Sequence, residues 1–404
     1  MKILFLTDEF YPTFGANSLL VRTLAQELMC NEHEVFVMPF AYESALPSEE
    51  IWNGIHVIRC IRADDKQLLL DNLRKGSIAT AAKIGFKYVR GRICPKRQLL
   101  PKDRIAARGV LETFIKEQHI DAVISICCSI ELSFPLLYLR KKNKLPCRWL
   151  FYMIDPFESH SYYRSIEKTS VLRRVQHDIM MHCDAVVATE LIYNDTKQWE
   201  AEEILSKISV VEFPKIEKPF KQACEDGVEL SKEKINIVCT GSKNEQVRNS
   251  EYTMQLCERF KDENVIFHFI GHGWCEAEQN NCIFYCPRSH EAVRNLQMDA
   301  NFLLNIGNVV TNQLPSKILE YISTGKPIIN VCKSAACPTL ALLKGDDALH
   351  LLESDEIEKS YVKLKDFIYA ERTAVSFEEI QKQYKIYTPA YVAKQILSIL
   401  QSLN

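Results

Sequence analysis

The sequence predicts an α/β protein of two doubly wound domains, each built on a mainly parallel sheet. Short apolar strands alternate with amphipathic helices along most of the chain, which is the pattern of a parallel sheet covered on both faces. A length of 404 residues exceeds what one hydrophobic core normally supports. A polar stretch without clear periodicity, residues 214–233, interrupts the alternation and is the expected link between the domains.

The composition indicates a soluble globular protein. Hydrophobic residues make up 47% of the chain and charged residues 25%. No apolar run reaches the ~18–20 residues of a membrane span. The start, MKILFLTDEF, is typical of a first strand rather than of a signal peptide. The 15 cysteines are scattered, and Cys127, Cys128 and Cys239 fall within expected strands, where a free Cys acts as a small hydrophobe, so we expect a cytoplasmic protein.

The first half of the chain opens with a strand at 2–7, a loop, and a helix along one side of which leucines recur. Asn17 is the expected N-cap of this helix. Further strands are expected at 34–39, 54–60, 121–127, 148–155, 184–190 and 207–213, and further helices at 103–118, 130–143 and 170–182.

The second half repeats the alternation. Strands are expected at 235–241, 264–271, 282–285, 301–307 and 327–332, and helices at 250–261, 289–297 and 391–403. The stretch NQLPSKILEYISTGKPII (312–329) predicts one more helix, because Pro315 suits a first helical position and Gly325 ends the apolar pattern.

Two candidate site residues lie near strand ends in the first half, where doubly wound sheets bind their ligands. Gly15 lies in a loop that feeds a helix N-terminus, and a glycine there lets a ligand approach the backbone; a simple turn is the alternative. Asp155 ends a strand ahead of Pro156, so it is either a functional group or a turn former.

Lys317 and Glu320 are candidates in the second half. A cation in the first turn of a helix opposes the helix macrodipole, at a cost of roughly 0.3–1 kcal/mol. That cost is understandable if a phosphate binds at the helix N-terminus beside Lys317. Glu320 lies on the same helix face and is placed to accept hydrogen bonds from ribose hydroxyls. An ordinary Lys–Glu surface pair explains the two residues equally well.

A further group of candidates follows the strand at 235–241. Gly241 ends this strand, and Lys243 and Arg248 come after it, so that together with Lys317 the two cations are able to clamp a diphosphate. The sequence contains no Walker A motif, no G-x-G-x-x-G and no Asp-x-Asp. The spacing of the His and Cys residues at 268–286 fits no closed zinc site, so no metal is expected.

The segment 66–108 is strongly basic. It contains twelve Lys or Arg residues against two Asp residues, although the net charge of the chain is −2. Aliphatic and aromatic residues are interleaved with the cations, a composition that is typical of a surface binding an anionic membrane. A helical insertion neutralised by acidic neighbours is the alternative.

On these motifs the chain resembles the GT-B glycosyltransferases, in particular the retaining group called glycosyltransferase family 4 (group 1). KILFLTDEFYPTFGAN is similar to that family's first strand and glycine loop, RWLFYMIDPF to the segment that ends in a polar residue facing the sugar, and TGSKNEQVRN to its phosphate-binding segment. NQLPSKILEYISTGKPII resembles the donor-binding Glu-x7-Glu segment and is the most specific of the four. The resemblance covers nearly the whole chain.

The resemblance implies two Rossmann-like domains that face a cleft. Residues 1–214 would hold the acceptor, 215–386 would hold a nucleotide-sugar donor, and 387–404 would form a helix that crosses back to the first domain. The implied activity is a retaining, metal-independent hexosyl transfer in surface polysaccharide or glycolipid biosynthesis. The donor would be UDP- or GDP-linked and the acceptor a glycan or a lipid-linked sugar, with no cofactor and no nucleic acid. The enzyme would be cytoplasmic, at most peripheral on the membrane.

Carried over position by position, Glu320 matches the glutamate that binds ribose, and Arg248 matches the lysine that contacts the diphosphate. Gly15 matches the loop near the sugar and phosphate. Asp155 stands where many members have a histidine. With Asn312, discussed next, Asp155 and Arg248 are the catalytic candidates.

Two positions depart from the family pattern. Ser242 stands where the family has an arginine, and Lys243 follows one place later. Asn312 stands at the first glutamate of the pair, and an amide still hydrogen-bonds a sugar hydroxyl but cannot act as a base. Two rival functions stay open: a GT-B nucleotide-sugar epimerase, which needs acid–base groups around the sugar, and a non-catalytic partner subunit that binds sugar nucleotides.

Overall fold

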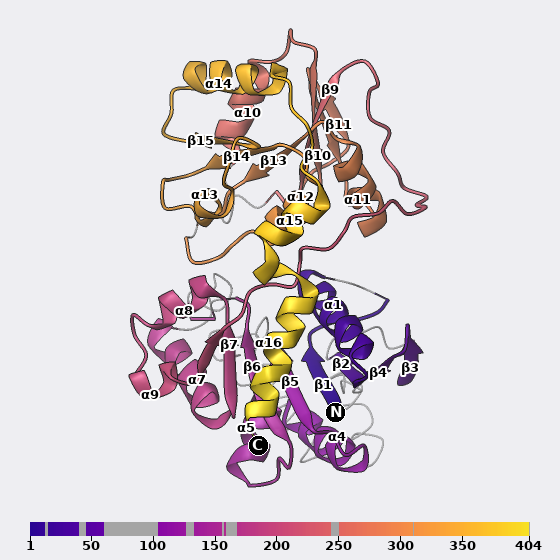
Figure 1. Cartoon of the computed structure of the whole chain (residues 1–404), viewed down its shortest axis with the longest axis vertical. Helices are drawn as coiled ribbons and strands as arrows, with labels where there is room; N and C mark the ends of the chain where they lie inside the picture. Colours follow the sequence, from indigo (N-terminus) through magenta and orange to yellow (C-terminus); the bar gives the residue numbers. More distant parts are fainter. Residues whose placement is uncertain are drawn as a thin grey trace, which may run out of the picture. The chain divides into compact units, whose positions relative to one another are not determined.

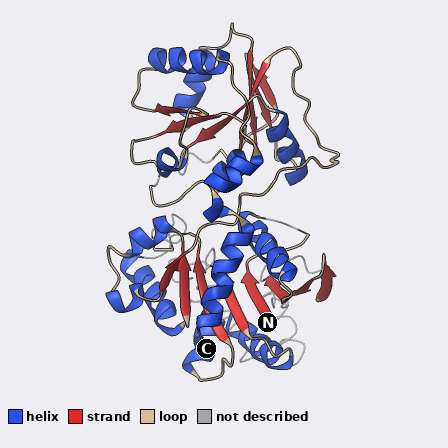
Figure 2. Ribbon diagram, viewed as in Figure 1, coloured by secondary structure: helices blue, strands red, loops and turns tan. Residues whose placement is uncertain are grey.

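In a computed structural model the chain folds into two compact units, each built around one mainly parallel sheet (Figures 1 and 2). Unit 1 comprises Met1–Pro214 and Pro389–Asn404, and unit 2 comprises Lys215–Thr388. The structure describes residues 1–12, 15–39, 46–59, 104–126, 133–155, 157–158, 168–243, 250–309 and 311–403. The predicted α/β class is confirmed.

The sheet of unit 1 has the strand order β3-β4-β2-β1-β5-β6-β7-β8, and β3 pairs antiparallel with β4 while the other described pairs are parallel. The sequence did not predict β3. It is a short edge strand of alternating exposure joined to β4 by a tight turn, so it lacks the apolar run of an inner strand. The strands are β1 (Lys2–Thr7), β2 (Glu34–Pro39), β3 (Glu49–Trp52), β4 (Ile55–Ile58), β5 (Ala122–Ile126), β6 (Arg148–Met153), β7 (Ala185–Ala188) and β8 (Ile208–Val210).

The described helices of unit 1 include the C-terminal helix, which packs against α1 (Figure 1). They are α1 (Ala16–Cys30), α4 (Arg104–Glu117), α5 (Ser133–Lys141), α7 (Thr169–His182), α8 (Glu190–Thr196), α9 (Glu202–Leu205) and α16 (Pro389–Ser402). Gly15, not Asn17, is the N-cap of α1, so the predicted cap is wrong. The Gly15 carbonyl already accepts the N–H of Leu19 and the hydroxyl of Ser18, and the helix therefore begins before Asn17.

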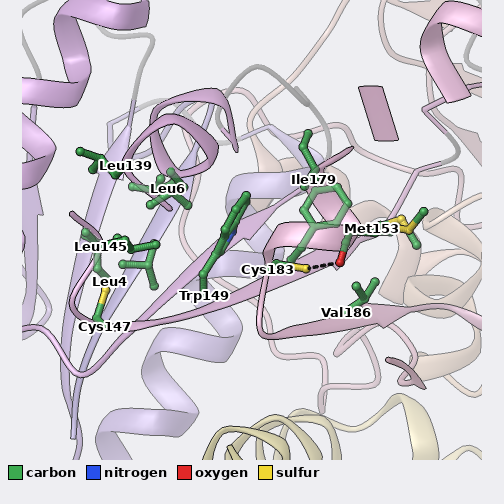
Figure 3. Close-up of a cluster of buried hydrophobic side chains, with 14 of the residues drawn as sticks. Leu4, Leu6, Leu139, Leu145, Cys147, Trp149, Met153, Ile179, Cys183 and Val186 are labelled. Carbon is green, nitrogen blue, oxygen red and sulfur yellow. Dashed lines mark hydrogen bonds between the residues drawn. The ribbon is translucent and has the colours of Figure 1, made fainter. Parts of the chain in front are cut away.

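Trp149 of β6 is fully buried in the core of unit 1. Figure 3 shows its ring between Leu4 and Leu6 of β1 on one side and Ile179 of α7 on the other. The indole N–H donates to the Ser125 hydroxyl at 2.9 Å, so the one polar atom of the ring keeps a partner inside the core. Truncating a buried Trp of this kind to Ala costs about 3–5 kcal/mol, which makes this cluster a main source of stability.

The sheet of unit 2 has the order β11-β12-β10-β9-β13-β14-β15, with β11 antiparallel at one edge. Its strands are β9 (Ile235–Thr240), β10 (Val265–Ile270), β11 (Ala277–Gln279), β12 (Cys282–Tyr285), β13 (Phe302–Ile306), β14 (Ile328–Cys332) and β15 (Ala348–Leu352). Its helices are α10 (Glu251–Glu258), α11 (His290–Asp299), α12 (Lys317–Ser323), α13 (Pro338–Leu342), α14 (Ile357–Tyr369), α15 (Phe377–Gln383) and the 3-10 helix η3 (Lys385–Tyr387).

Unit 2 differs from the sequence analysis in the edge strands β11 and β15, which were not predicted, and at the start of α12. Helix α12 begins at Lys317 with Ser316 as its N-cap, so Pro315 precedes the helix instead of opening it. The Pro315 carbonyl accepts the N–H of Ile318, which forms a separate turn ahead of the helix. The polar stretch 214–233 carries no helix or strand, yet it packs on unit 2, because Asp226 accepts hydrogen bonds from the backbone and hydroxyl of Ser289 at the start of α11.

Cys239 is a buried free thiol in β9, as predicted, whereas Cys127 and Cys128 lie outside the described residues. Within the part of the chain that the structure describes, no helix combines the length and the apolar character needed to cross a bilayer.

Candidate functional site

Unit 2 has a pocket where the winding of its sheet reverses. The strands after β9 continue to one side through β10 and β12, whereas β13, β14 and β15 lie on the other side. Doubly wound sheets bind ligands at this switch point, beyond the carboxyl ends of the two central strands. The pocket is partly open to solvent and is lined by Cys239, Thr240, Gly241, Ser242, Lys243, Ser250, Trp274, Leu304, Asn305, Ile306 and Lys317.

Glycine at two positions lets two loops meet at one wall of this pocket. Gly241, directly after β9, has φ +137°, and Gly271, directly after β10, has φ +140°, a region that other residues rarely adopt. A Cβ at Gly271 would lie 2.4 Å from the Gly241 carbonyl oxygen, so the two backbones approach this closely only because residue 271 is a glycine. The same carbonyl accepts the indole N–H of Trp274 at 3.1 Å, which holds the ring in the wall.

Tyr321 fixes helix α12 to the end of β9. Its side chain is buried, and its hydroxyl accepts the backbone N–H of Thr240 at 2.7 Å. The amide of Gln297 in α11 donates to the Thr240 hydroxyl at 2.9 Å. These two bonds connect α12 and α11 to the strand, and they place Lys317, one turn before Tyr321, at the pocket.

The pocket carries positive charge. Lys243 extends over the Trp274 ring, with its Nζ 5.2 Å from the ring centroid, and Lys317 lines the same hollow with a side chain that is 30% exposed. None of the described lining residues is acidic. Two cations at the carboxyl ends of the central strands, with no described acidic residue in the lining, form an environment suited to an anion such as a phosphate.

Glu320 lies one turn after Lys317 and is held by two lysines. Its Oε2 lies 3.3 Å from the Nζ of Lys317, and its Oε1 lies 3.8 Å from the Nζ of Lys215. Burial raises the pKa of Glu320, but the charges of Lys317, Lys215 and His290 outweigh burial and hold the pKa at about 2. The Lys317–Glu320 pair is therefore present, but it is no ordinary surface pair, because the Glu320 side chain is only 16% exposed.

The structure brings together Gly241, Lys243 and Lys317 in the pocket and joins Glu320 to Lys317. Asn312 lies half-buried in the loop before α12 and is not one of the described lining residues. Arg248 lies outside the described residues, as does most of the basic segment 66–108, namely 66–103.

The other two candidates belong to unit 1. Gly15 caps α1 in extended backbone conformation, with the Glu9 carboxyl against its Cα. Asp155 is half-buried just beyond β6.

Three residues of this site escaped the sequence analysis. Lys215 lies in the stretch taken for a link, where a lysine carries no signal. Trp274 follows the loop after β10, and its role depends on the contact with Gly241. Asn305 was the one detectable residue, because it is a polar residue in the otherwise apolar strand FLLNI.

His268, one of the residues weighed as a zinc ligand, is buried in β10. Its two ring nitrogens face the Tyr285 hydroxyl at 3.1 Å and the Asn236 side-chain oxygen at 3.0 Å. Burial lowers the pKa of His268 to about 4. Among the described residues there is no group of three or more His, Cys, Asp or Glu side chains able to hold a metal ion.

The two Rossmann-like units, with their sheets of eight and seven strands, give the chain the GT-B fold. No family model and no curated protein sequence matches the chain. Solved structures do match over the full length of the chain, at low sequence identity.

Sucrose-phosphate synthase from Thermosynechococcus elongatus superposes with a TM-score of 0.67 at 10% identity, covering 100% of this chain and 99% of that one. The lipopolysaccharide outer core galactosyltransferase WaaB has a TM-score of 0.60 at 14% identity, with the same coverage. A candidate UDP-N-acetylglucosamine 2-epimerase from Listeria monocytogenes has a TM-score of 0.60 at 11% identity, covering 99% and 96%. The fold therefore occurs in transferases and also in an epimerase candidate.

Proposed function

We propose that the protein is a glycosyltransferase that binds a nucleoside-diphosphate sugar in unit 2 and transfers the sugar to an acceptor. The observation that carries this proposal is the pocket at the β9/β13 switch point, which Lys243 and Lys317 line. A diphosphate is the ligand that such a pair of cations complements best. The likeness in fold to glycosyltransferases adds support.

The proposed chemistry assigns each side chain of the pocket a separate part. When the bond between the sugar and the diphosphate breaks, negative charge builds up on the leaving oxygen, and groups placed beforehand to stabilise it lower the barrier. Lys243 and Lys317 supply the positive charge that stabilises the leaving oxygen. Glu320 is ionised at neutral pH, because its pKa is about 2, and it accepts hydrogen bonds from the ribose hydroxyls.

Three more residues complete the proposal. Arg248 is assigned to the same diphosphate by the sequence resemblance alone. Asn312 positions the donor through its amide, since an amide side chain hydrogen-bonds a sugar hydroxyl but does not act as an acid or a base at neutral pH. Asp155 of unit 1 acts on the sugar or the acceptor hydroxyl.

The finer assignment is also a proposal. We infer a retaining hexosyl transfer from a UDP- or GDP-linked donor to a glycan or lipid-linked acceptor, as in surface polysaccharide or glycolipid assembly. Metal independence is supported by the two lysines, which neutralise the diphosphate where other enzymes use a divalent cation. Peripheral attachment to an anionic membrane, from the cytoplasm, is supported by the charge of the segment 66–108.

Incubation with a panel of nucleotide sugars, with and without a chelator, tests the function. Release of nucleoside diphosphate that depends on an added acceptor supports transfer, and release that survives the chelator supports metal independence. An isomerised donor identifies an epimerase, and tight binding without turnover identifies a non-catalytic subunit. Co-sedimentation with anionic and neutral liposomes at low and high salt tests the membrane assignment, which requires salt-sensitive binding to the anionic vesicles.

A further inference from the structure

Lys215 is a buried cation that faces the Glu320 carboxylate. Its side chain is 7% exposed, and its Nζ lies 3.8 Å from Oε1 of Glu320, while the Nζ of Lys317 lies 3.3 Å from the other oxygen. One carboxylate thus lies between two ammonium groups. A buried ammonium group has lost most of its hydration, and an anion beside it offsets that loss. The position of Lys215 is therefore tied to the charge of Glu320.

The two lysines differ in their freedom to leave Glu320. Lys317 lines the pocket and is partly exposed, so its ammonium group is able to turn toward a ligand. Lys215 is not one of the described lining residues. Its backbone N–H is fixed to the Tyr387 carbonyl at 2.9 Å, and its side chain is packed away from solvent. Lys215 is thus the permanent partner of Glu320, and Lys317 is the exchangeable one.

A diphosphate in the pocket competes with Glu320 for Lys317. If Lys317 turns to the phosphate, Glu320 loses its nearer cation and needs another to stay ionised in a buried position. Two of the charges that lower the pKa of Glu320 then remain, Lys215 and His290, and Lys215 has the larger effect. Without Lys215, either Glu320 retains Lys317 and the phosphate loses a cation, or Glu320 takes up a proton and no longer accepts two hydroxyl hydrogen bonds.

Resting on the function proposed above, we propose that Lys215 is a positioning residue of the donor site. It holds the Glu320 carboxylate ionised and aimed at the ribose hydroxyls while Lys317 turns to the diphosphate. Lys215 itself does not contact the nucleotide.

Isothermal titration of the full-length protein with ADP, CDP, GDP, UDP and dTDP tests the inference. For the nucleotide that binds best, Lys215→Met is expected to weaken binding about tenfold. The reason is that the hydrogen bond from the ribose hydroxyls to the charged Glu320 carboxylate is lost or misplaced. Lys215→Arg, which keeps the charge, is expected to retain most of the affinity. Lys218→Met is the matched control, because Lys218 follows in the same stretch with a side chain that is 72% exposed.

A double-mutant cycle with Glu320→Gln separates positioning from mere structural support. If Lys215 acts through Glu320, Lys215→Met has little further effect once Glu320→Gln is present. If Lys215 only supports the fold, it weakens binding equally in both backgrounds, and the inference is overturned. Lys215→Gln enters the same cycle as a second variant that retains a polar side chain, and thermal melts verify that each variant is folded.

The outcomes distinguish the inference from the function on which it rests. If no nucleoside diphosphate binds the wild type, or if Glu320→Gln binds as well as the wild type, the donor site itself is wrong and the inference falls with it. If Glu320→Gln weakens binding and Lys215→Met does not, only the role of Lys215 is overturned.

Discussion

The two units share one type of sheet winding, but the described residues that follow β1 and β6 in unit 1 differ in charge from those that line the pocket of unit 2. In unit 2 the pocket at this edge is lined by Lys243 and Lys317. In unit 1 the described residues at the corresponding edge include Glu9, after β1, and Asp155, after β6. The strand orders are alike, so the difference lies in the loops. The winding of a sheet locates a site at its carboxyl edge, and the charge of the loops there favours one kind of ligand over another.

The buried carboxyl groups of the two units show the same contrast. Glu212 of unit 1 is 8% exposed, and burial raises its pKa, although the backbone N–H of Glu190 donates to it. Glu320 of unit 2 is also desolvated, but nearby cations hold its pKa at about 2. Ionising the buried Glu212 of unit 1 is thus costly, whereas the buried Glu320 of unit 2 is ionised at neutral pH, in keeping with the proposed role of Glu320.

The largest effect is expected for Asp155, at the carboxyl end of β6 in unit 1, which we expect to serve catalysis and not donor binding. Asp155→Asn should lower turnover about 100-fold or more, the usual scale for losing an acid–base group, while affinity for nucleoside diphosphate stays unchanged. Steady-state kinetics and titration calorimetry measure the two quantities. Asp178→Asn, which removes a partly exposed carboxylate of α7 that pairs with Lys141 and His182, is the control. Weaker nucleotide binding by Asp155→Asn would break the division between the two edges.

The next largest effect is expected for the two lysines of the pocket in unit 2. Lys243→Met and Lys317→Met should each weaken nucleoside-diphosphate binding by about tenfold or more, because a charge-assisted hydrogen bond to phosphate is lost. Lys261→Met, at an exposed position of the same unit, should bind like the wild type. Calorimetry at two salt concentrations checks the result, and an affinity unaffected by either change would remove the pocket from the donor site.

Gly241 of unit 2 and Gly15 of unit 1 differ in backbone conformation, so their replacement by Ala should have different costs. Gly241→Ala forces a side chain onto φ +137°, which costs on the order of 1–3 kcal/mol, so thermal stability and nucleotide affinity should both fall. Gly15 has an ordinary φ of −85°, and a Cβ there meets only the movable Glu9 carboxyl. Gly15→Ala should therefore lower the melting temperature less than Gly241→Ala does, and only to the extent that Ala is a poorer N-cap than Gly. Equal losses in both variants would contradict this account.

The smallest effects should have opposite signs in the two units. The raised pKa of Glu212 means that the folded state binds this proton more tightly than the unfolded state, so stability falls as pH rises through the window above the usual 4.5. Glu212→Gln removes that cost and should raise the melting temperature at pH 7.5 by about 2 °C. The gain should shrink toward pH 4, where the wild-type carboxyl is protonated.

For Glu320 the expected change in melting temperature has the opposite sign. Its lowered pKa stabilises the folded state above the usual value of 4.5, and this contribution is lost as pH falls toward 2. Glu320→Gln should lower the melting temperature at pH 7.5, because it also leaves Lys215 and Lys317 without their shared anion. Melts of both variants between pH 4 and pH 8 check the signs, and two shifts in the same direction would refute the contrast.

Much of the fold was predictable because each inner strand is a short apolar run that is recognisable from a few neighbouring residues. The runs KILFLT and EVFVMP are apolar and short, and both strands lie where the sequence placed them. The edge strands β3, β11 and β15 were not predicted. Strands β3 and β11 are only four and three residues long and carry exposed positions, so no apolar run marks them, and β15 is largely half-buried. The helix α12 was predicted, but its first turn was misplaced by the assumption that Pro315 opens it.

The candidate site was predictable only in part, for a related reason. Gly241, Lys243 and Lys317 were found because each follows or precedes a strand in a recognisable motif, and the structure places all three in one pocket. Trp274 and Lys215 belong to segments without any such motif, and nothing near them in the sequence indicates their partners. Their parts depend on contacts with Gly241 and Glu320, which lie in other segments of the chain.

The sequence by itself determined the α/β class, the alternation of strands and helices, and the residues that end the central strands, because periodicity and turn chemistry act over a few neighbouring residues. Only the tertiary structure decided that Lys243 and Lys317 line one pocket and that Lys215 and Lys317 share Glu320. Those relations depend on strand order and helix packing, which join distant segments. The low pKa of Glu320 follows from them, because burial and the surrounding cations exist only in the folded chain.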